Sequence, residues 1–572
     1  MGKSEINETM RPSQLIYHNG PGAIVDLLDR SVMVMAADTW RIPFQSSIKD
    51  ERVLQALNKE EIKLLNEYPD KVEVTVTPFP KWKICPKCQM MTNYTDKNHC
   101  HYCEQNGEII PLYPSRFVIS CAKGHVSDFP YVEWVHQNKS CTADQPVLKL
   151  LKKGDSGSLS DLSVTCVKCQ ATMSLANILT KDALKDIVPV CTGEQYWLQQ
   201  TEPCGEEVKT YLRGASNIYS PSIVSFLQIP LSEEHRDPLM KKVLNHKSTL
   251  DSVKENDDKF TTLLSVLEFD SEDKERILHI LNVAHDESLS YQSIRKQEWN
   301  TLVKKDINDL SESGYKSKSV SIHQKMRRYF SAIHRVDAVP ELQVLRGFTR
   351  IEYVDRFEIE GSEKLLPIMK NKQNNWLPGI KNIGEGIFFQ FNRSTILNWQ
   401  NKHHPDDISK IIMEHFNAQR EKLGYNNIPF DSKYVMMHTF SHALIKELAN
   451  HSGYATTALK ERIYCDDQME GVLIYTASGD SEGTLGGLIE QSSEDKLYPI
   501  FIRALERMMH CSSDPHCSEG EFMYQSTANG AACHACGFVS ETSCDMGNQL
   551  LDRRLLININ PNEKYGFFDL NE

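Results

Sequence analysis

The sequence predicts an α+β protein of several domains, and three observations lead to this fold class. First, 572 residues exceed the length of one ordinary domain. Second, segments with strand-like alternation and segments with helical periodicity follow one another along the chain. Third, fifteen of the sixteen cysteines fall into two blocks, residues 85–204 and 511–544. We expect four parts: an N-terminal α/β segment (1–80), a cysteine-rich region (81–215), a helical insert (216–340) and a mixed α/β module (341–572).

The first 80 residues begin with a glycine-rich turn. Residues 19–22 read Asn-Gly-Pro-Gly, and strand-like alternation follows at 23–27 and again at 71–79. Apolar residues at helical spacing predict a helix over 48–68. No Gly-Lys-Ser/Thr follows the turn, nor does a P-loop occur elsewhere in these 572 residues, so an ATPase of that type is not expected.

The insert is polar, with helical periodicity around Phe260 and Leu264. Within it, residues 295–335 hold ten Lys or Arg against four acidic residues, and Tyr315, Tyr329 and Phe330 lie between them. Such a stretch can follow a phosphate backbone, or it can be the solvated face of a helix. In the C-terminal module, helices are predicted over 435–450 and 498–509, and a buried strand over 471–477.

Charge and hydropathy narrow the class of protein. The net charge is −13, so nucleic-acid binding would need a local basic patch or a partner with the main contacts. The sequence has no run of about 18 apolar residues, so no membrane span is predicted. The polar N-terminus does not resemble a secretory signal. We therefore expect a cytoplasmic protein, in which clustered cysteines indicate metal sites rather than disulfides.

The clearest metal motif joins two CxxC knuckles, Cys85/Cys88 and Cys100/Cys103, with eleven residues between them. Two knuckles place four thiolates around one ion in the tetrahedral geometry that zinc prefers. We expect a structural zinc ribbon here, with no open position for catalysis. Cys465 stands outside both blocks and is expected to be an ordinary buried thiol.

A second zinc site is predicted from the knuckle Cys166/Cys169 together with Cys191 and Cys204. The alternative is that the last two are thiols of the core. Four further residues between these groups can form a mixed third site: Cys121, His125, His136 and Cys141. Equally, the His125 imidazole can bond to a carbonyl or pair with Asp128 in a turn.

The last cysteine block predicts a four-cysteine zinc site that closes the C-terminal module. Five cysteines compete for four positions. Cys533, Cys536 and Cys544 are expected ligands, with Cys517 as the fourth, although spacing does not separate Cys517 from Cys511.

Two other motifs carry possible chemistry. His438 and His442 lie at i and i+4 of a predicted helix, but Thr439 stands where a zinc peptidase has its glutamate, which favours packing or partner contact. Asp480 and Glu482 lie in a glycine-rich loop that can bind Mg²⁺ or a phosphate, or can be a polar turn. A metal-dependent nuclease using these carboxylates is the alternative to a protein without catalytic residues.

Several segments together resemble the DrmB family, whose members are components of bacterial DISARM anti-phage systems. These segments are 11–16, 20–26, 121–136, 213–217, 384–386, 438–442, 475–487 and 511–548. The resemblance covers nearly the whole chain and is least over 232–340. The C-terminal part also resembles the zinc-binding module of MrfA-like helicases, in which four cysteines hold zinc beside a motor.

The resemblance implies a function that the residues alone do not. It implies a Zn²⁺-binding, helicase-associated and DNA-binding subunit for antiviral defence. Because the module is present here without a motor, the motor is expected on another chain, which in this family is a DrmA-like helicase. DNA would be contacted through that complex.

Overall fold

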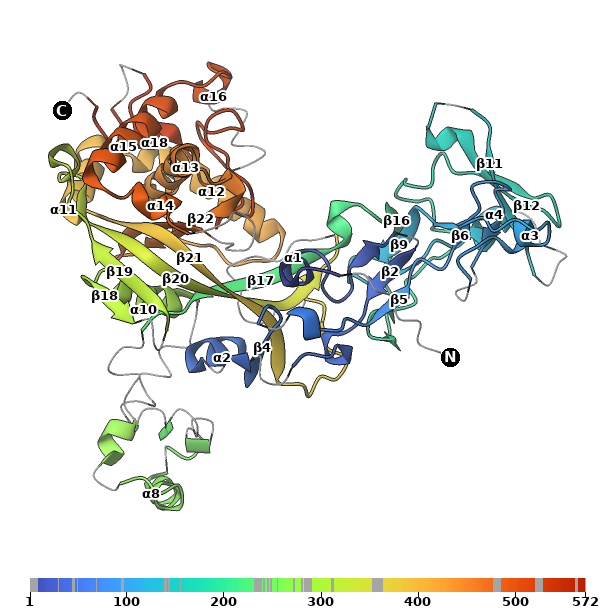
Figure 1. The fold of residues 1–572 in the computed structure, drawn as a ribbon, viewed down its shortest axis with the longest axis horizontal. Coiled ribbons are helices and arrows are strands. Elements are labelled where there is room, and N and C mark those ends of the chain that lie inside the picture. The colour runs from blue at the N-terminus through green and yellow to red at the C-terminus, as the bar shows by residue number, and fades with distance from the viewer. Residues whose placement is uncertain are drawn as a thin grey trace. The chain divides into compact units, whose positions relative to one another are not determined.

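The structure is a computed structural model of the 572 residues, and its ribbon is shown in Figure 1. The described residues are 9–28, 30–43, 47–48, 50–67, 69–93, 97–137, 141, 145–154, 156–230, 239, 242–243, 246, 249–250, 252–254, 256–270, 273–278, 281, 291–309, 313–351, 364–476, 485–519, 528–560 and 564–570. Within these ranges, no helix combines the length and apolar character needed to cross a bilayer.

The chain divides into two compact units, and the fold is of the predicted α+β class. Unit 1 comprises Met1–Ser225 and Gln343–Ile380, and unit 2 comprises Phe226–Leu342 and Lys381–Glu572. Two long strands, β20 (Phe330–Thr349) and β21 (Trp376–Phe391), each begin in one unit and end in the other. The boundaries expected at residues 80, 215 and 340 remain predictions.

Unit 1 begins with helix α1 (Pro12–Tyr17) and an antiparallel sheet of order β1-β2-β5, formed by Ile24–Asp26, Ser31–Val34 and Val76–Pro78. The glycine-rich turn precedes β1. Gly22 has φ +86°, and a Cβ there would stand 2.3 Å from the Phe348 ring, so the turn requires glycine. The helix expected over 48–68 is wrong in its second half. Helix α2 (Glu51–Leu57) ends at left-handed Asn58, and Glu61–Leu64 forms strand β4.

The cysteine-rich part of unit 1 contains three small three-stranded sheets (Figure 1), and a two-stranded ribbon of β14 (Glu194–Gln195) and β15 (Gln200–Thr201). The first is β7-β6-β8, the second β10-β9-β16 and the third β11-β12-β13. None of these strands exceeds five residues. They are β7 (Met91–Thr92), β6 (Lys83–Ile84), β8 (Tyr113–Pro114), β10 (Val126–Asp128), β9 (Phe117–Cys121), β16 (Val208–Leu212), β11 (Leu148–Lys152), β12 (Leu162–Cys166) and β13 (Thr172–Ser174). Cysteine sulfurs are part of the core between them, because Cys121, Cys166 and Cys191 are all buried in one apolar cluster.

Unit 2 is built on an antiparallel sheet of order β18-β19-β20-β21-β23-β22. Besides β20 and β21, its strands are β18 (Ile307–Asp309), β19 (Tyr315–Ser319), β23 (Glu470–Thr476) and β22 (Leu459–Cys465). Three strands therefore lie at the C-terminal end of the segment expected to be a helical insert: β18, β19 and the first residues of β20. Helix α13 (Ser432–Ser452) and helix α15 (Glu494–Met509) pack on one another, close to the predicted positions. Helix α13 is buried almost all round, because β22, α15 and α18 (Arg553–Leu556) all contact it.

The polar insert has its own small apolar core within unit 2. Helix α8 (Asp257–Val266) begins at Asn256, whose side chain accepts a hydrogen bond from the Lys259 backbone NH. Phe260 and Leu264 on this helix pack with Val243, Leu250, Ile277 and Leu281. Helix α10 (Tyr291–Leu302) follows and carries Glu298, which is fully buried and paired with Arg462 at 2.8 Å.

Arg350 ties together three separate segments of unit 1. Its guanidinium is 1% exposed and donates to the carbonyl oxygens of Gly22 at 2.6 Å, Gly124 at 3.1 Å and Ile218 at 2.5 Å. The guanidinium also lies near the Phe348 ring, 5.0 Å from its centroid. Burial lowers the pKa of Arg350 to about 9. The cost of this burial is offset because the planar group satisfies three carbonyls at once.

We predict that Arg350→Lys lowers the free energy of unfolding by about 2–4 kcal/mol, since a single ammonium nitrogen cannot reach the three carbonyl oxygens that three different guanidinium nitrogens contact. Urea denaturation monitored by intrinsic fluorescence measures the change. The matched control is Arg346→Lys near the end of β20, four residues before Arg350, where the guanidinium is half-buried and bonds to Ser222. It should cost less than about 1 kcal/mol. Equal effects of both substitutions would contradict the role given to Arg350.

Candidate metal centres

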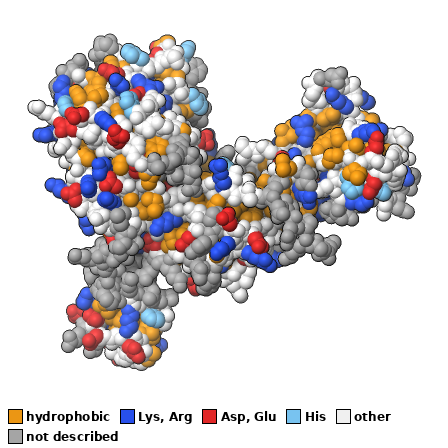
Figure 2. Space-filling model, viewed as in Figure 1, with side chains coloured by type: hydrophobic (Ala, Val, Ile, Leu, Met, Phe, Trp, Pro, Cys, Tyr) orange, Lys and Arg blue, Asp and Glu red, His pale blue; other side chains and the backbone are white. Residues whose placement is uncertain are grey.

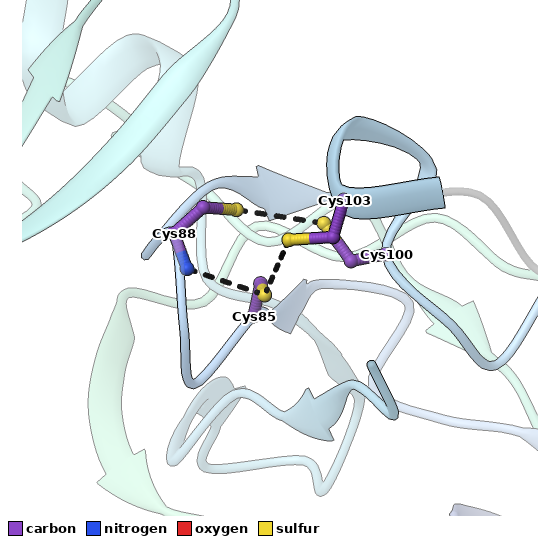
Figure 3. A group of neighbouring side chains, drawn as sticks. All are labelled: Cys85, Cys88, Cys100 and Cys103. Atoms are coloured by element: carbon purple, nitrogen blue, oxygen red, sulfur yellow. Dashed lines mark hydrogen bonds between the residues drawn. The ribbon is translucent and has the colours of Figure 1, made fainter. Parts of the chain in front are cut away.

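Four cysteines of the first predicted site meet as expected (Figure 3). Cys85 and Cys88 lie on the turn between β6 and β7, while Cys100 and Cys103 lie at the start of helix α3 (His101–Glu104). The Sγ atoms of Cys85 and Cys103 are 3.8 Å apart, and those of Cys88 and Cys100 are 3.5 Å apart. Four sulfurs bound to zinc at about 2.3 Å stand about 3.8 Å apart at the corners of a tetrahedron. The cluster therefore fits zinc and leaves no fifth donor position.

The second predicted site is wrong in its grouping, because its four cysteines belong to two clusters. Cys191 and Cys204 lie with Cys121 and His125, and we call this group the outer cluster. Cys166 and Cys169 lie with His136 and Cys141, and we call this group the inner cluster. The inner ligands, residues 136–169, are nested along the chain between the two halves of the outer set. The alternative in which Cys191 and Cys204 are only core thiols does not account for their proximity to a histidine and a third sulfur.

In the outer cluster, the histidine is held from both sides. His125 Nδ1 lies 3.5 Å from Cys121 Sγ, and His125 Nε2 bonds to Glu202 Oε1 at 2.8 Å. The alternative in which His125 pairs with Asp128 is wrong, because that carboxylate accepts from the backbone NH groups of Lys81 and Trp82. A carboxylate on the far nitrogen orients an imidazole and raises its basicity as a metal ligand. Hydrogen bonds from Cys191 and His125 lower the pKa of Cys121 to about 4.

In the inner cluster, a backbone carbonyl orients the histidine. His136 lies at the end of helix α4 (Tyr131–His136), and its Nδ1 bonds to the Val132 carbonyl at 2.7 Å. Because Nδ1 then carries the proton, the lone pair on Nε2 points to Cys169 Sγ, 3.3 Å away. Burial opposes ionisation of Cys166, but hydrogen bonds from the backbone NH groups of Cys169 and Lys168 help to lower the pKa of that thiol to about 6. Both mixed clusters thus contain three sulfurs and one correctly oriented nitrogen.

Sequence spacing did not decide between Cys511 and Cys517, and the C-terminal cluster contains both. Cys511 Sγ lies 3.5 Å from Cys533 Sγ, and Cys517 Sγ lies 3.7 Å from Cys536 Sγ. Cys544 was expected here, but its sulfur lies elsewhere, with His438, His442 and Glu461. Two cations flank the four sulfurs. Lys446 bonds to the Cys536 carbonyl, and Arg553 pairs with Asp514. Lys446 offsets part of the net charge of −2 that four thiolates and one Zn²⁺ would carry, whereas the charge of Arg553 is balanced by Asp514.

The remaining predicted residues lie outside these clusters. His438 and His442 are fully buried on helix α13, so neither is placed for partner contact. Asp480 and Glu482 lie outside the described residues. Among the described residues, Cys465 is the cysteine that joins no metal-like group, and burial raises its pKa.

Comparison with known proteins assigns the chain to a family. It is 32% identical over 555 residues to a protein of Bacillus paralicheniformis (strain ATCC 9945a / NCIMB 11709 / CD-2) described as "DISARM protein DrmB". The alignment covers 93% of this chain and 97% of that protein. The chain belongs to the DrmB family.

Two family models also match this DrmB-family chain. One is the MrfA Zn-binding domain, which matches residues 440–537 and includes the four sulfurs of the C-terminal cluster. The predicted likeness to that module is therefore confirmed. The other is a domain of unknown function, DUF8724, over residues 11–220, which includes the remaining three cysteine clusters.

We predict that double substitutions will report which cysteines share an ion. Cys121→Ser with Cys191→Ser removes two ligands of the outer cluster and should lower bound zinc by one ion per chain. Cys166→Ser with Cys191→Ser damages both mixed clusters and should lower it by two. Inductively coupled plasma mass spectrometry on desalted protein measures zinc against protein concentration.

The matched control is Cys465→Ser, which should leave the zinc content unchanged. The opposite order would contradict the nested arrangement. In that case, loss of one ion from the Cys166/Cys191 pair and two from the Cys121/Cys191 pair would restore the grouping that spacing suggests.

Proposed function

We propose that this chain is a non-catalytic, zinc-stabilised subunit of an anti-phage complex of the DISARM type. The observation that carries the proposal is the 32% identity to "DISARM protein DrmB", which extends over 93% of the chain. An alignment of that extent reaches into both units. We further propose that the complex contains a DrmA-like helicase and contacts DNA, and that it acts in the cytoplasm, where thiols stay reduced.

Closed coordination supports a structural role for the metal. Each of the four cysteine-rich clusters offers four protein donors, which fill the tetrahedral sphere of Zn²⁺ and leave no position for water or substrate. No P-loop occurs in the 572 residues. No observation on the described residues favours the nuclease alternative, since His438 and His442 face a buried glutamate and cysteine rather than a cleft.

A helicase partner is supported by the C-terminal module. The MrfA Zn-binding domain model matches residues 440–537, and this part of the chain resembles a module that accompanies a motor on the same chain in MrfA-like helicases. We propose that the motor is supplied here in trans. The zinc of the C-terminal cluster would keep α15 and the following loops in place as part of the docking surface.

A basic loop of unit 2 supports contact with DNA. Lys325, Arg327 and Arg328 are exposed around the short helix η6 (Gln324–Met326), between strands β19 and β20. The aromatic residues predicted to accompany them do not take part, because Tyr329 and Phe330 are buried against the core. The loop would therefore contact phosphates without stacking on bases. On the face shown in Figure 2, Lys and Arg lie among Asp and Glu, so a local contact of this kind fits better than a broad basic surface.

The experiment that tests the proposal is co-expression of the full chain with the helicase gene of its own locus. We expect the two proteins to elute together in size-exclusion chromatography at moderate salt. The isolated chain should show no DNA-stimulated ATP hydrolysis, whereas the pair should. DNA-dependent ATPase activity of the chain alone, or separate elution of the two proteins, would contradict the proposed role.

We predict that charge reversal of the basic loop weakens DNA binding by the complex. The triple variant Lys325→Glu, Arg327→Glu and Arg328→Glu should lower the affinity and reduce the slope of log K against log salt by about 2–3, because each phosphate contact contributes about 0.9. Fluorescence anisotropy with labelled DNA over a series of salt concentrations measures both quantities.

The matched control reverses three exposed lysines of helices α11 (Arg393–His403) and α12 (Asp406–Lys422), namely Lys402, Lys410 and Lys422. It changes the net charge by the same amount and should leave the slope within about 0.5 of the wild-type value. An unchanged slope in the loop variant would favour a scaffold that does not touch nucleic acid through this loop.

A further inference from the structure

Four metal-type side chains converge in the interior of unit 2, outside the four cysteine-rich clusters. They are His438 and His442 of helix α13, Glu461 of strand β22 and Cys544, with no side chain more than 3% exposed. Glu461 Oε1 lies 3.0 Å from His438 Nε2 and 3.4 Å from His442 Nε2. Cys544 Sγ lies 3.2 Å from His438 Nε2. We call these four residues the buried HHEC group.

The two imidazoles present bare nitrogens to the centre of the group. His438 Nδ1 bonds to the Leu550 carbonyl at 3.2 Å, and His442 Nδ1 bonds to the Gly537 carbonyl at 2.7 Å. A carbonyl only accepts, so each Nδ1 carries a proton and, in the neutral ring, each Nε2 carries a lone pair. These lone pairs point at a carboxylate oxygen and a sulfur, and His442 Nε2 has no hydrogen-bond partner.

The other two donors are also oriented as anions. Cys544 Sγ accepts backbone NH groups from Met546 and Asn548, both at 3.2 Å. Glu461 Oε1 accepts the Asp545 backbone NH at 3.1 Å, and its second oxygen accepts the Ser441 hydroxyl. NH groups directed at sulfur stabilise a thiolate, the form that binds metal. Four acceptors thus face one point, an arrangement that is repulsive unless a cation or extra protons lie among them.

We propose that His438 Nε2, His442 Nε2, Glu461 and Cys544 Sγ bind a structural zinc ion. Two neutral imidazoles, one carboxylate and one thiolate with Zn²⁺ give zero net charge, which suits a fully buried site. The N/O/S donor set matches zinc, and binding releases the thiol proton to solvent. The His-x3-His spacing on α13 thus belongs to a closed site, and the carboxylate ligand comes from another element instead of from position 439.

This ion would join three elements of unit 2. Helix α13 supplies two donors, β22 one, and the loop after Cys536 the fourth. The loop also carries the C-terminal cluster, because the Gly537 carbonyl that orients His442 follows Cys536 directly. One buried helix would therefore position two metal centres, one through its histidines and one through Lys446, which bonds to the Cys536 carbonyl.

Anomalous diffraction from crystals of the full wild-type chain tests the proposal without a substitution. We expect a peak within about 2.0–2.3 Å of all four donor atoms in data collected above the zinc edge, absent in data collected below it. No peak there, in crystals that show peaks at the four cysteine-rich clusters, would overturn the proposal. A peak that persists below the zinc edge and above the iron edge would overturn the assignment to zinc.

A second measurement uses zinc content. Cys544→Ala should lower bound zinc by one ion per chain, while the matched control Cys465→Ala on the same strand as Glu461 leaves it unchanged. Equal zinc in wild type and Cys544→Ala would overturn the proposal. If Cys544→Ala does not fold, the wild-type diffraction experiment decides.

Discussion

Clustered thiolates and imidazole lone pairs repel one another in a protein interior unless a cation or extra protons lie among them, and this constraint shapes both units. The sheets around the first three clusters have strands of two to five residues, too short to bury much apolar surface on their own. Buried sulfurs complete their core. Zinc bound there would replace missing apolar area with coordination bonds, so that metal binding and folding of this region become one equilibrium.

The nested order of ligands makes that equilibrium cooperative. The outer cluster joins residues 121–125 to 191–204, and the inner cluster joins 136–141 to 166–169 inside the same loop. Closing the inner cluster shortens the effective loop between the two halves of the outer cluster. The entropic cost of closing the outer cluster is therefore lower. In unit 2, helix α13 contacts the C-terminal cluster through Lys446 and supplies two histidines to the buried HHEC group. A partner that docks beside the C-terminal cluster would therefore meet a rigid surface. A zinc-stabilised subunit that presents fixed surfaces is what the DrmB-family relationship leads us to propose.

Local patterns predicted the fold class, and non-local pairing accounts for what they missed. The two CxxC knuckles at 85–103 are close in sequence, and their meeting follows from spacing. Cys166 and Cys191 are also close in sequence, yet β9 and β16 carry Cys121 toward Cys191 by pairing Cys121 with Val208. Glu461 gave no signal, because a glutamate in an alternating strand resembles any solvent-facing residue. Tyr329 and Phe330 lie beside basic residues in the sequence, but Phe330 packs against Phe440 in the core.

The central claim is that zinc in this chain is closed, sulfur-rich and structural. X-ray absorption at the zinc K-edge of the purified full chain tests it most directly. The account predicts a four-coordinate first shell dominated by sulfur at about 2.3 Å, with a minority of nitrogen or oxygen at about 2.0–2.1 Å. A first shell dominated by nitrogen and oxygen, or one with a water ligand that exchanges with added cyanide, would contradict it.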